Sequence, residues 1–186
     1  MFGGHLIVRH AMHRTFQLTL MGSCLTLVSA CGTPTTAFRV PGGGMEPNIN
    51  PGDTIEVRHN AYRSASDVHR SDVVVLAIPG EQPERLAVKR VLGLPGERVS
   101  ITKGRVSVNG ATLSLRPQHG SVFLEEAPPR SYLVTLSGAC SESLEATVPE
   151  GHFYVIGDNR CASLDSRAFG AVPFSAIRGR EVGSEE

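Results

Sequence analysis

Residues 86–96 read LAVKRVLGLPG, which predicts a short apolar strand that carries one lysine, Lys89, and ends at a Pro-Gly turn. Alternation along the strand places Lys89 on the same face as Ala87 and Val91. A lysine among such neighbours loses hydration of its charged form, which lowers its pKa and makes it a candidate general base near neutral pH. The alternative is a surface lysine on a half-exposed strand.

The rest of the chain predicts an all-β domain of short antiparallel strands joined by tight turns. Apolar or alternating runs bounded by Gly, Pro and polar residues recur along it. They cover residues 54–58, 72–78, 98–102, 105–109 and 151–157. Lys103 and Gly104 separate two of these runs, which predicts a two-residue hairpin turn. Residues 111–150 are polar with short apolar runs and predict little.

Charge and composition exclude several classes of function. The sequence has 18 Lys and Arg against 18 Asp and Glu, so the formal net charge is zero and nothing predicts nucleic-acid binding. The spacing of Cys and His predicts no metal site, and we expect no cofactor. Cys140 and Cys161 form a possible disulfide in an oxidising compartment, with two free thiols as the alternative.

The N-terminal segment predicts export. Residues 1–30 combine a basic start, an apolar run and a small-residue end, and the segment that ends at Cys31 resembles a lipobox, so we expect a lipoprotein-type signal peptide with lipidation of Cys31. Cleavage after Ala30 and an uncleaved membrane anchor are the alternatives. Residues 31–40 would then be an extended tether that holds a β domain, 41–186, at a membrane surface outside the cytoplasm.

Two further stretches carry a family resemblance together with the lysine strand. Residues 40–47 read VPGGGMEP, and residues 157–170 read GDNRCASLDSRAFG. In this order and spacing the three stretches resemble the conserved boxes of type I signal peptidases (leader peptidases), membrane-bound serine peptidases with a Ser/Lys dyad. The resemblance runs from about Val40 to Arg180. It implies a signal-peptidase-like antiparallel β-sheet domain.

The resemblance also implies roles for single residues, and one of them is missing. Lys89 takes the place of the general base, and Ser163 that of the hydroxyl that orients the lysine amine. The nucleophilic serine precedes the Met in the family, and Gly44 stands there in this chain. Gly42 stands where many members have a second hydroxyl that helps to bind the oxyanion. Met45 and Pro47 are expected to line the cleft near the substrate.

The resemblance also implies a charged network that holds the loop of residues 157–170 against the core. Asp165 and Arg167 are expected to pair across one strand turn. The members of the network are Asp158, Arg160, Asp165 and Arg167. A solvated loop is the alternative for all four. Cys161 lies in the same loop, near Lys89, and is the substitute nucleophile to test first if the chain proves active.

These observations predict three functions. The first is a catalytically impaired pseudopeptidase, tethered to a membrane, that binds an extended peptide such as the signal region of a preprotein; strand addition needs no serine. The second is an active signal peptidase that removes signal peptides from exported preproteins, through an unconventional nucleophile or a serine in the natural chain. The third is a structural or interaction lipoprotein without a peptide groove.

Overall fold

The structure is a computed structural model, and it describes Met1, residues 34–138, Cys140 and residues 143–183. The predicted export signal of residues 1–30 and the predicted lipidation site at Cys31 lie outside the described residues, Met1 excepted. Among the residues described, no helix is long and apolar enough to cross a membrane.

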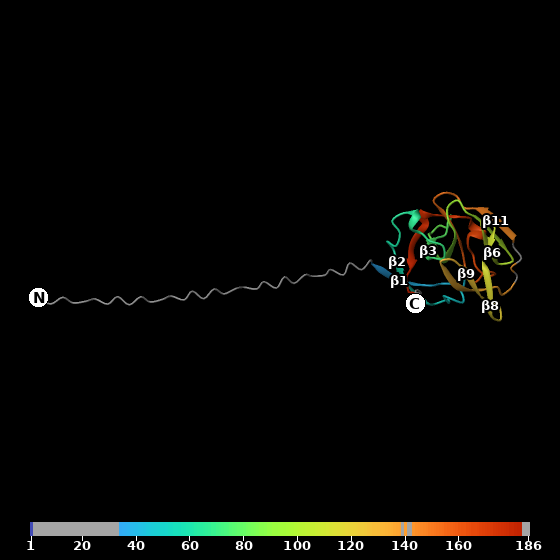
Figure 1. Ribbon diagram of the computed structural model, residues 1–186, viewed down its shortest axis with the longest axis horizontal. Helices are drawn as coiled ribbons and strands as arrows, with labels where there is room; N and C mark the ends of the chain where they lie inside the picture. Colours follow the sequence, from blue (N-terminus) through green and yellow to red (C-terminus); the bar gives the residue numbers. More distant parts are fainter. Residues whose placement is uncertain (2–33, 139, 141–142, 184–186) are drawn as a thin grey trace. The chain divides into compact units, whose positions relative to one another are not determined.

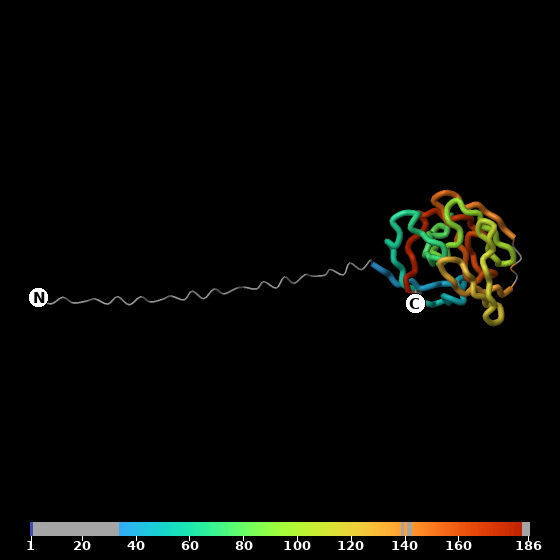
Figure 2. The backbone as a smooth tube through the Cα atoms, viewed as in Figure 1, coloured from blue at the N-terminus to red at the C-terminus, as the bar shows by residue number. Residues whose placement is uncertain are grey.

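The prediction of an all-β fold is confirmed, since antiparallel sheets make up nearly all of the regular secondary structure in the described residues (Figure 1). The largest sheet has the strand order β1-β2-β14-β3-β4-β12-β13. Its strands are β1 (Thr35–Arg39), β2 (Thr54–Arg58), β3 (Val73–Ala77), β4 (Leu86–Gly93), β12 (His152–Ile156), β13 (Val172–Pro173) and β14 (Ile177–Glu181). Figure 2 shows that the end of the chain (red) returns among strands from its beginning, and β14 pairs with both β2 and β3.

Two smaller sheets complete the fold. One has the order β11-β5-β6-β7, and the other β10-β9-β8. Their strands are β5 (Arg98–Thr102), β6 (Arg105–Val108), β7 (Ala111–Thr112), β8 (Ser114–His119), β9 (Val122–Ala127), β10 (Arg130–Thr135) and β11 (Ser143–Thr147). The helical pieces are η1 (Ala65–Asp67), α1 (Ser166–Phe169) and η2 (Phe174–Ala176).

Strand β4 lies at the centre of the packing. Its residues contribute to three hydrophobic clusters: Val88 to one with β2 and β3, Val91 to one with Val74 and Phe153, and Leu92 to one with β5 and β6. On one side β4 pairs with β3 from Leu86 to Arg90. On the other side β12 pairs with β4 only from Arg90 to Gly93. The first half of β4 therefore leaves one edge open within the described sheet.

The β5–β6 hairpin forms as the sequence predicts. Lys103 and Gly104 both have positive φ, +51° and +76°, as a two-residue type I′ turn requires. The register places Val99 opposite Val108 and Ile101 opposite Val106. These side chains are buried and enter the same cluster as Leu92.

One boundary expected from the sequence differs from the structure, and one region contains more structure than the sequence predicted. The extended tether expected over residues 31–40 is already part of the sheet from Thr35 onward, because β1 pairs with β2 and Val40 is buried in the core. Residues 111–150, for which the sequence predicted little, contain β7 to β11. Their polar residues are not confined to the surface, since Glu125 on β9 is fully buried.

Candidate active site

Lys89 is buried on β4, with 7% of its surface exposed, so the alternative of a surface lysine was wrong. Its Nζ donates a hydrogen bond to the carbonyl of Val88 at 2.8 Å. Burial lowers the pKa of Lys89 below its ordinary value, and the negative charges of Asp165 and Asp158 oppose that shift only in part. The amine therefore loses its proton more readily than an exposed lysine does.

Gly44 lies directly against the amine. A Cβ atom built on Gly44 would be 3.1 Å from Lys89 Nζ and 3.2 Å from Ser163 Oγ. The backbone of Gly44 has no positive φ, so nothing in its conformation requires glycine. The three positions singled out in the sequence thus converge on one point, and a hydroxymethyl side chain at position 44 would lie between an amine and a hydroxyl.

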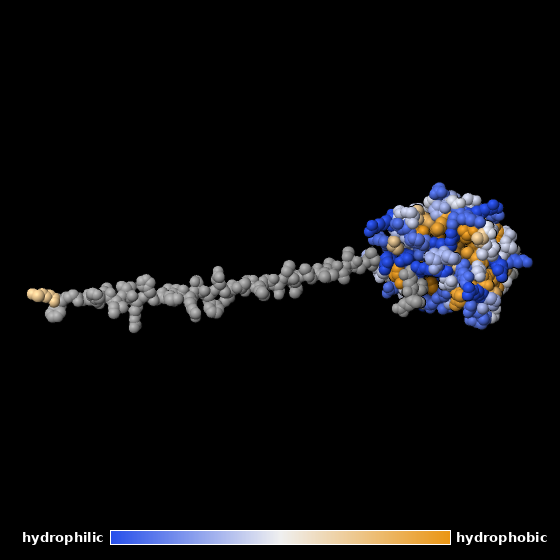
Figure 3. Space-filling view, in the orientation of Figure 1, coloured by the Kyte–Doolittle hydropathy of each residue, from blue (hydrophilic) through white to orange (hydrophobic). Residues whose placement is uncertain are grey.

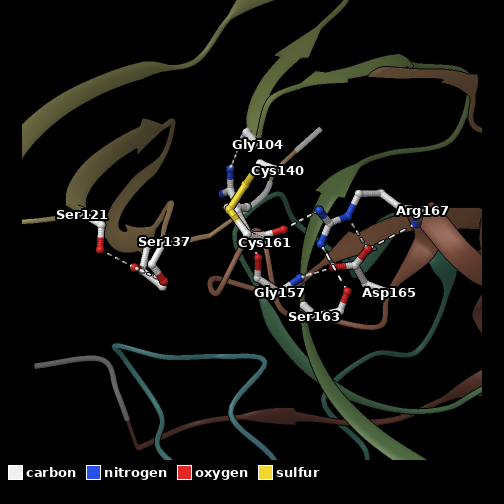
Figure 4. Close-up of a disulfide and its surroundings, with 11 residues drawn as sticks. Gly104, Ser121, Ser137, Cys140, Gly157, Cys161, Ser163, Asp165 and Arg167 are labelled. Carbon is white, nitrogen blue, oxygen red and sulfur yellow. Dashed lines mark hydrogen bonds and ion pairs between the residues drawn. A yellow bond between two sulfur atoms is a disulfide. The ribbon is translucent and has the colours of Figure 1, made fainter. Parts of the chain in front are cut away.

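Ser163 contributes a hydroxyl that has no partner within the described structure. Its Oγ is buried and makes no hydrogen bond there, although a serine hydroxyl can both donate and accept. Its carbonyl accepts a hydrogen bond from Arg167 Nη2 at 3.3 Å, which holds this part of the backbone in place (Figure 4). The unpaired hydroxyl faces the position that a side chain of residue 44 would occupy.

Asn159 holds the glycine-rich loop, a role that sequence reasoning missed. Its backbone N–H donates to the Gly44 carbonyl at 3.1 Å, and its Nδ2 donates to the Gly43 carbonyl at the same distance. Nδ2 also donates to Glu46 at 3.2 Å. Three successive glycines suggest a loose loop, but these hydrogen bonds fix it from a segment more than 100 residues away. The asparagine of the GDN motif was the signal that could have revealed them.

Position 157 accommodates only glycine, because two parts of the site lie close to its backbone. A Cβ built there would collide with the Gly44 carbonyl oxygen and with the Ser163 side chain. Its N–H donates to Asp165 at 3.0 Å, so the residue also anchors the loop that follows it (Figure 4). No larger residue fits between the glycine-rich loop and the serine.

Asp165 and Arg167 form an ion pair, but the expected strand turn between them was wrong. Asp165 is the N-cap of the short helix α1 and accepts the N–H of Arg167. The Arg167 side chain donates to the Asp165 carboxylate through Nε at 2.8 Å and Nη2 at 2.7 Å. Arg167 Nη1 donates to the Arg160 carbonyl, which ties the helix to the preceding loop.

Asp158 and Arg160 take partners from distant strands that the sequence did not identify. Asp158 accepts two hydrogen bonds from Arg90 of β4, at 2.8 and 2.7 Å, and one from Asn48 at 2.7 Å. Arg160 is fully buried and pairs with Glu125 of β9. Burial alone would lower the pKa of Arg160, but the charge and hydrogen bonds of Glu125 raise it above its ordinary value.

Tyr132 joins these two ion pairs. Its hydroxyl donates to Glu125 at 2.8 Å, and its ring lies 3.8 Å from the guanidinium carbon of Arg90. With the Asp165–Arg167 pair, the network therefore contains three ion pairs, two of them around one aromatic ring, rather than charges on a solvated loop. It connects the segment after β12 to β4, β9 and β10.

Cys140 and Cys161 are joined in a disulfide, with their Cα atoms 4.8 Å apart (Figure 4). A disulfide sulfur is no nucleophile toward a peptide carbonyl, so Cys161 offers no thiolate in this state. The bond fixes the start of the segment that carries Ser163.

A groove of about 210 Å³ opens beside Lys89. One wall is the open edge of β4 from Leu86 to Lys89, and the opposite wall is the loop from Val40 to Met45. Ala162 and Leu164 border it, and Leu164 is 45% exposed, which is unusual for a large apolar residue of the folded part. Figure 3 shows several apolar areas (orange) interspersed with hydrophilic ones (blue) on the face in view.

Met45 and Pro47 occupy different places relative to this groove. Met45 borders it, but its side chain is 1% exposed and packs in the core. Pro47 is not among the lining residues. Gly42 lines the groove, and a Cβ built there would meet nothing within 4 Å.

In the described part of the chain, no group of three or more His, Cys, Asp or Glu side chains is arranged to hold a metal ion.

Comparison with known proteins gives consistent matches. Residues 12–183 match the family model described as signal peptidase, peptidase S26. Signal peptidase I V of Bacillus subtilis is 32% identical over 145 residues, which covers 76% of this chain and 80% of that protein. The mitochondrial ATP-independent inner membrane protease subunit 1a of Arabidopsis thaliana is 33% identical over 144 residues, which covers 77% of this chain and 66% of that protein.

A solved structure also matches, that of a signal peptidase I from Enterococcus faecalis V583. It is 30% identical in sequence, with a TM-score of 0.41, and the match covers 61% of this chain and 95% of that one. Coverage of the longer relatives is lower, since the signal peptidase I of Pseudomonas aeruginosa is matched over 54% of its length.

Proposed function

The chain belongs to the signal peptidase family, peptidase S26, and we propose that it binds extended, signal-peptide-like segments of exported preproteins in the groove beside Lys89 without the serine-dependent cleavage of an active peptidase. The single observation that carries this proposal is the position of Gly44. It faces Lys89 Nζ and Ser163 Oγ at the point where a nucleophile would be attached, and it has no side chain.

The groove supports binding of an extended peptide. Its wall from Leu86 to Lys89 is the half of β4 that β12 leaves unpaired, so a peptide backbone can add to this edge. The opposite wall is anchored by Asn159 and does not depend on a hydroxyl at position 44. Apolar lining residues such as Ala87 and Ile78 favour uncharged side chains in the part of the peptide next to them, and Arg85 adds a positive charge to the lining.

Buried interactions around the groove favour a rigid groove. The buried pairs Arg90–Asp158 and Arg160–Glu125 and the disulfide all fix the segment that borders the groove. The N-terminal segment supports an exported protein whose groove lies outside the cytoplasm. A lipid on Cys31 or a retained anchor would attach it to the membrane, whereas cleavage after Ala30 would release it.

The test uses the full chain in detergent micelles with a fluorescent peptide that carries an Ala-x-Ala end, and a preprotein with the same end. We expect saturable binding of the peptide and no detectable cleavage of the preprotein. Gly42→Trp is the matched blocking variant, because position 42 lines the groove and has open space around it, so a large side chain fills the groove without displacing the core. It should abolish binding and leave the unfolding midpoint unchanged.

Restoring the missing hydroxyl tests the assignment of the site. Gly44→Ser should gain cleavage by up to about a million-fold, since this is the order of the loss when the nucleophile of such a catalytic unit is removed. Gly44→Ser with Lys89→Ala should be inactive, and Gly42→Ser with Gly44→Ser should cleave faster than Gly44→Ser alone if a second hydroxyl helps to bind the oxyanion. Cleavage by the unaltered chain at the rate of Gly44→Ser would contradict the proposal. Absence of peptide binding would favour a structural lipoprotein instead.

A further inference from the structure

Two polar groups that can bind a small molecule border the space beside Gly44. Lys89 Nζ and Ser163 Oγ both approach the point where a Cβ of residue 44 would be, at 3.1 and 3.2 Å. The Ser163 hydroxyl is buried and has no hydrogen-bond partner in the described structure. A buried polar group without a partner costs free energy, so a small polar molecule that pairs with it would be stabilised there.

The size and chemistry of the missing side chain define what fits. Serine differs from glycine by one CH2O unit, so glycine together with a water or methanol molecule reproduces the hydroxyl and most of the volume of a serine. Gly44 lines the groove next to Lys89, which means that such a molecule would also contact whatever the groove binds. A bound water needs two to four polar partners, and the amine and the hydroxyl supply two.

We infer that the space beside Gly44 is a binding site for a small hydroxyl nucleophile, water in the native protein and methanol when it is supplied, which Lys89 activates for direct attack on an acyl group bound in the groove. This inference rests on the proposed function, because the acyl group must first bind. It adds a reaction in which the acyl group is never covalently bonded to the protein.

The Lys89 amine is arranged to act as the base. One of its N–H bonds is directed to the Val88 carbonyl at 2.8 Å, which orients the nitrogen. Burial lowers the pKa of Lys89, which favours loss of its proton and so exposure of the nitrogen lone pair. Ser163 Oγ can accept a hydrogen bond from the nucleophile or donate one to it, and so fixes its oxygen.

The reaction balances without any further reactant. The nucleophile oxygen forms a bond to the acyl carbon of an ester as its proton moves to Lys89 Nζ, and the tetrahedral intermediate then breaks its bond to the leaving alkoxide oxygen. Lys89 returns the proton to that leaving group. Water gives a carboxylic acid, and methanol gives a methyl ester. Because Gly42 has no hydroxyl side chain to help with the oxyanion, we expect a slow reaction.

The experiment uses the full chain in micelles with an Ala-x-Ala peptide as its ethyl ester. Water, methanol, ethanol and isopropanol are the nucleophiles, and mass spectrometry separates the acid from each new ester. Methanol should yield methyl ester, and the yield should fall as the alcohol grows beyond the size of a hydroxymethyl group. Lys89→Ala should lower the rate at least about a hundred-fold, the usual lower bound for loss of a general base.

Gly44→Ala is the matched control, because it fills the space with a methyl group but supplies no hydroxyl. It requires Lys89 Nζ and Ser163 Oγ to move by only a few tenths of an ångström. We expect it to lose methyl ester formation when both proteins are saturated with peptide, a comparison that a change in peptide affinity does not affect. Equal methyl ester formation by Gly44→Ala and the native chain, with equal peptide binding, would overturn the inference alone. Absence of peptide binding to the native chain would overturn the proposed function and this inference with it.

Discussion

Replacing Glu125 by glutamine should destabilise the protein strongly, because the change leaves a buried arginine without its counter-charge. Glu125 and Arg160 are both fully buried and form an ion pair between β9 and the loop after β12. Glutamine keeps the shape of the side chain but carries no negative charge to balance the guanidinium. Tyr132 would also lose a charged acceptor for its hydroxyl.

The magnitude follows from the burial of both partners. Removing one member of a buried ion pair costs about 3–5 kcal/mol, because the remaining charge stays desolvated and unpaired. The other carboxylate nearby, Asp158, is already held by Arg90 through two hydrogen bonds. For a domain of this size each kcal/mol lowers the melting temperature by about 2–4 °C, so a decrease of about 10 °C is expected.

Urea unfolding with the disulfide intact measures the effect. Glu145→Gln is the matched control, because Glu145 pairs with Arg98 on the surface with 53% and 66% of the two side chains exposed. That variant should change the free energy of unfolding far less than Glu125→Gln, because solvent screens the exposed pair. The double variant Glu125→Leu with Arg160→Met should recover much of the loss, since apolar packing often replaces a buried pair. If Glu125→Gln costs no more than Glu145→Gln, the reasoning about the buried pair is refuted.

Three further predictions concern the site. Gly157→Ala should destabilise by about 1–3 kcal/mol in urea unfolding through overpacking, whereas Gly42→Ala, which meets nothing within 4 Å, should be neutral; equal effects would contradict the close approach. Cys140→Ser should cost about 3 kcal/mol for a loop closed over a separation of 21 residues, and the difference should vanish after reduction. Lys89→Met should raise stability at neutral pH, because burial lowers the pKa of the folded lysine and the unfolded chain binds the proton more tightly. That advantage should be complete below the folded pKa and lost as pH rises toward about 10.4, the ordinary value for lysine; a constant advantage in urea midpoints across that range would contradict it.

Local sequence was enough to predict the short strands and the position of the lysine on the central one. Alternating runs and two-residue turns depend on neighbours along the chain, so the β5–β6 hairpin and β4 were predictable within a residue or two. The three motif stretches likewise identified Lys89, Gly44 and Ser163. The structure brings these three residues to one point.

The surroundings of that point depend on tertiary packing and could not be predicted. Asn159 reaches the glycine-rich loop, and Glu125 reaches Arg160, across separations of more than 100 and of 35 residues. Such pairings depend on how the sheets pack, which no local pattern encodes. The same packing buried Lys89, closed the disulfide at Cys161 and left half an edge of β4 open. The motifs identified the chemical groups, whereas burial and long-range hydrogen bonding set their protonation, their partners and their access to a peptide.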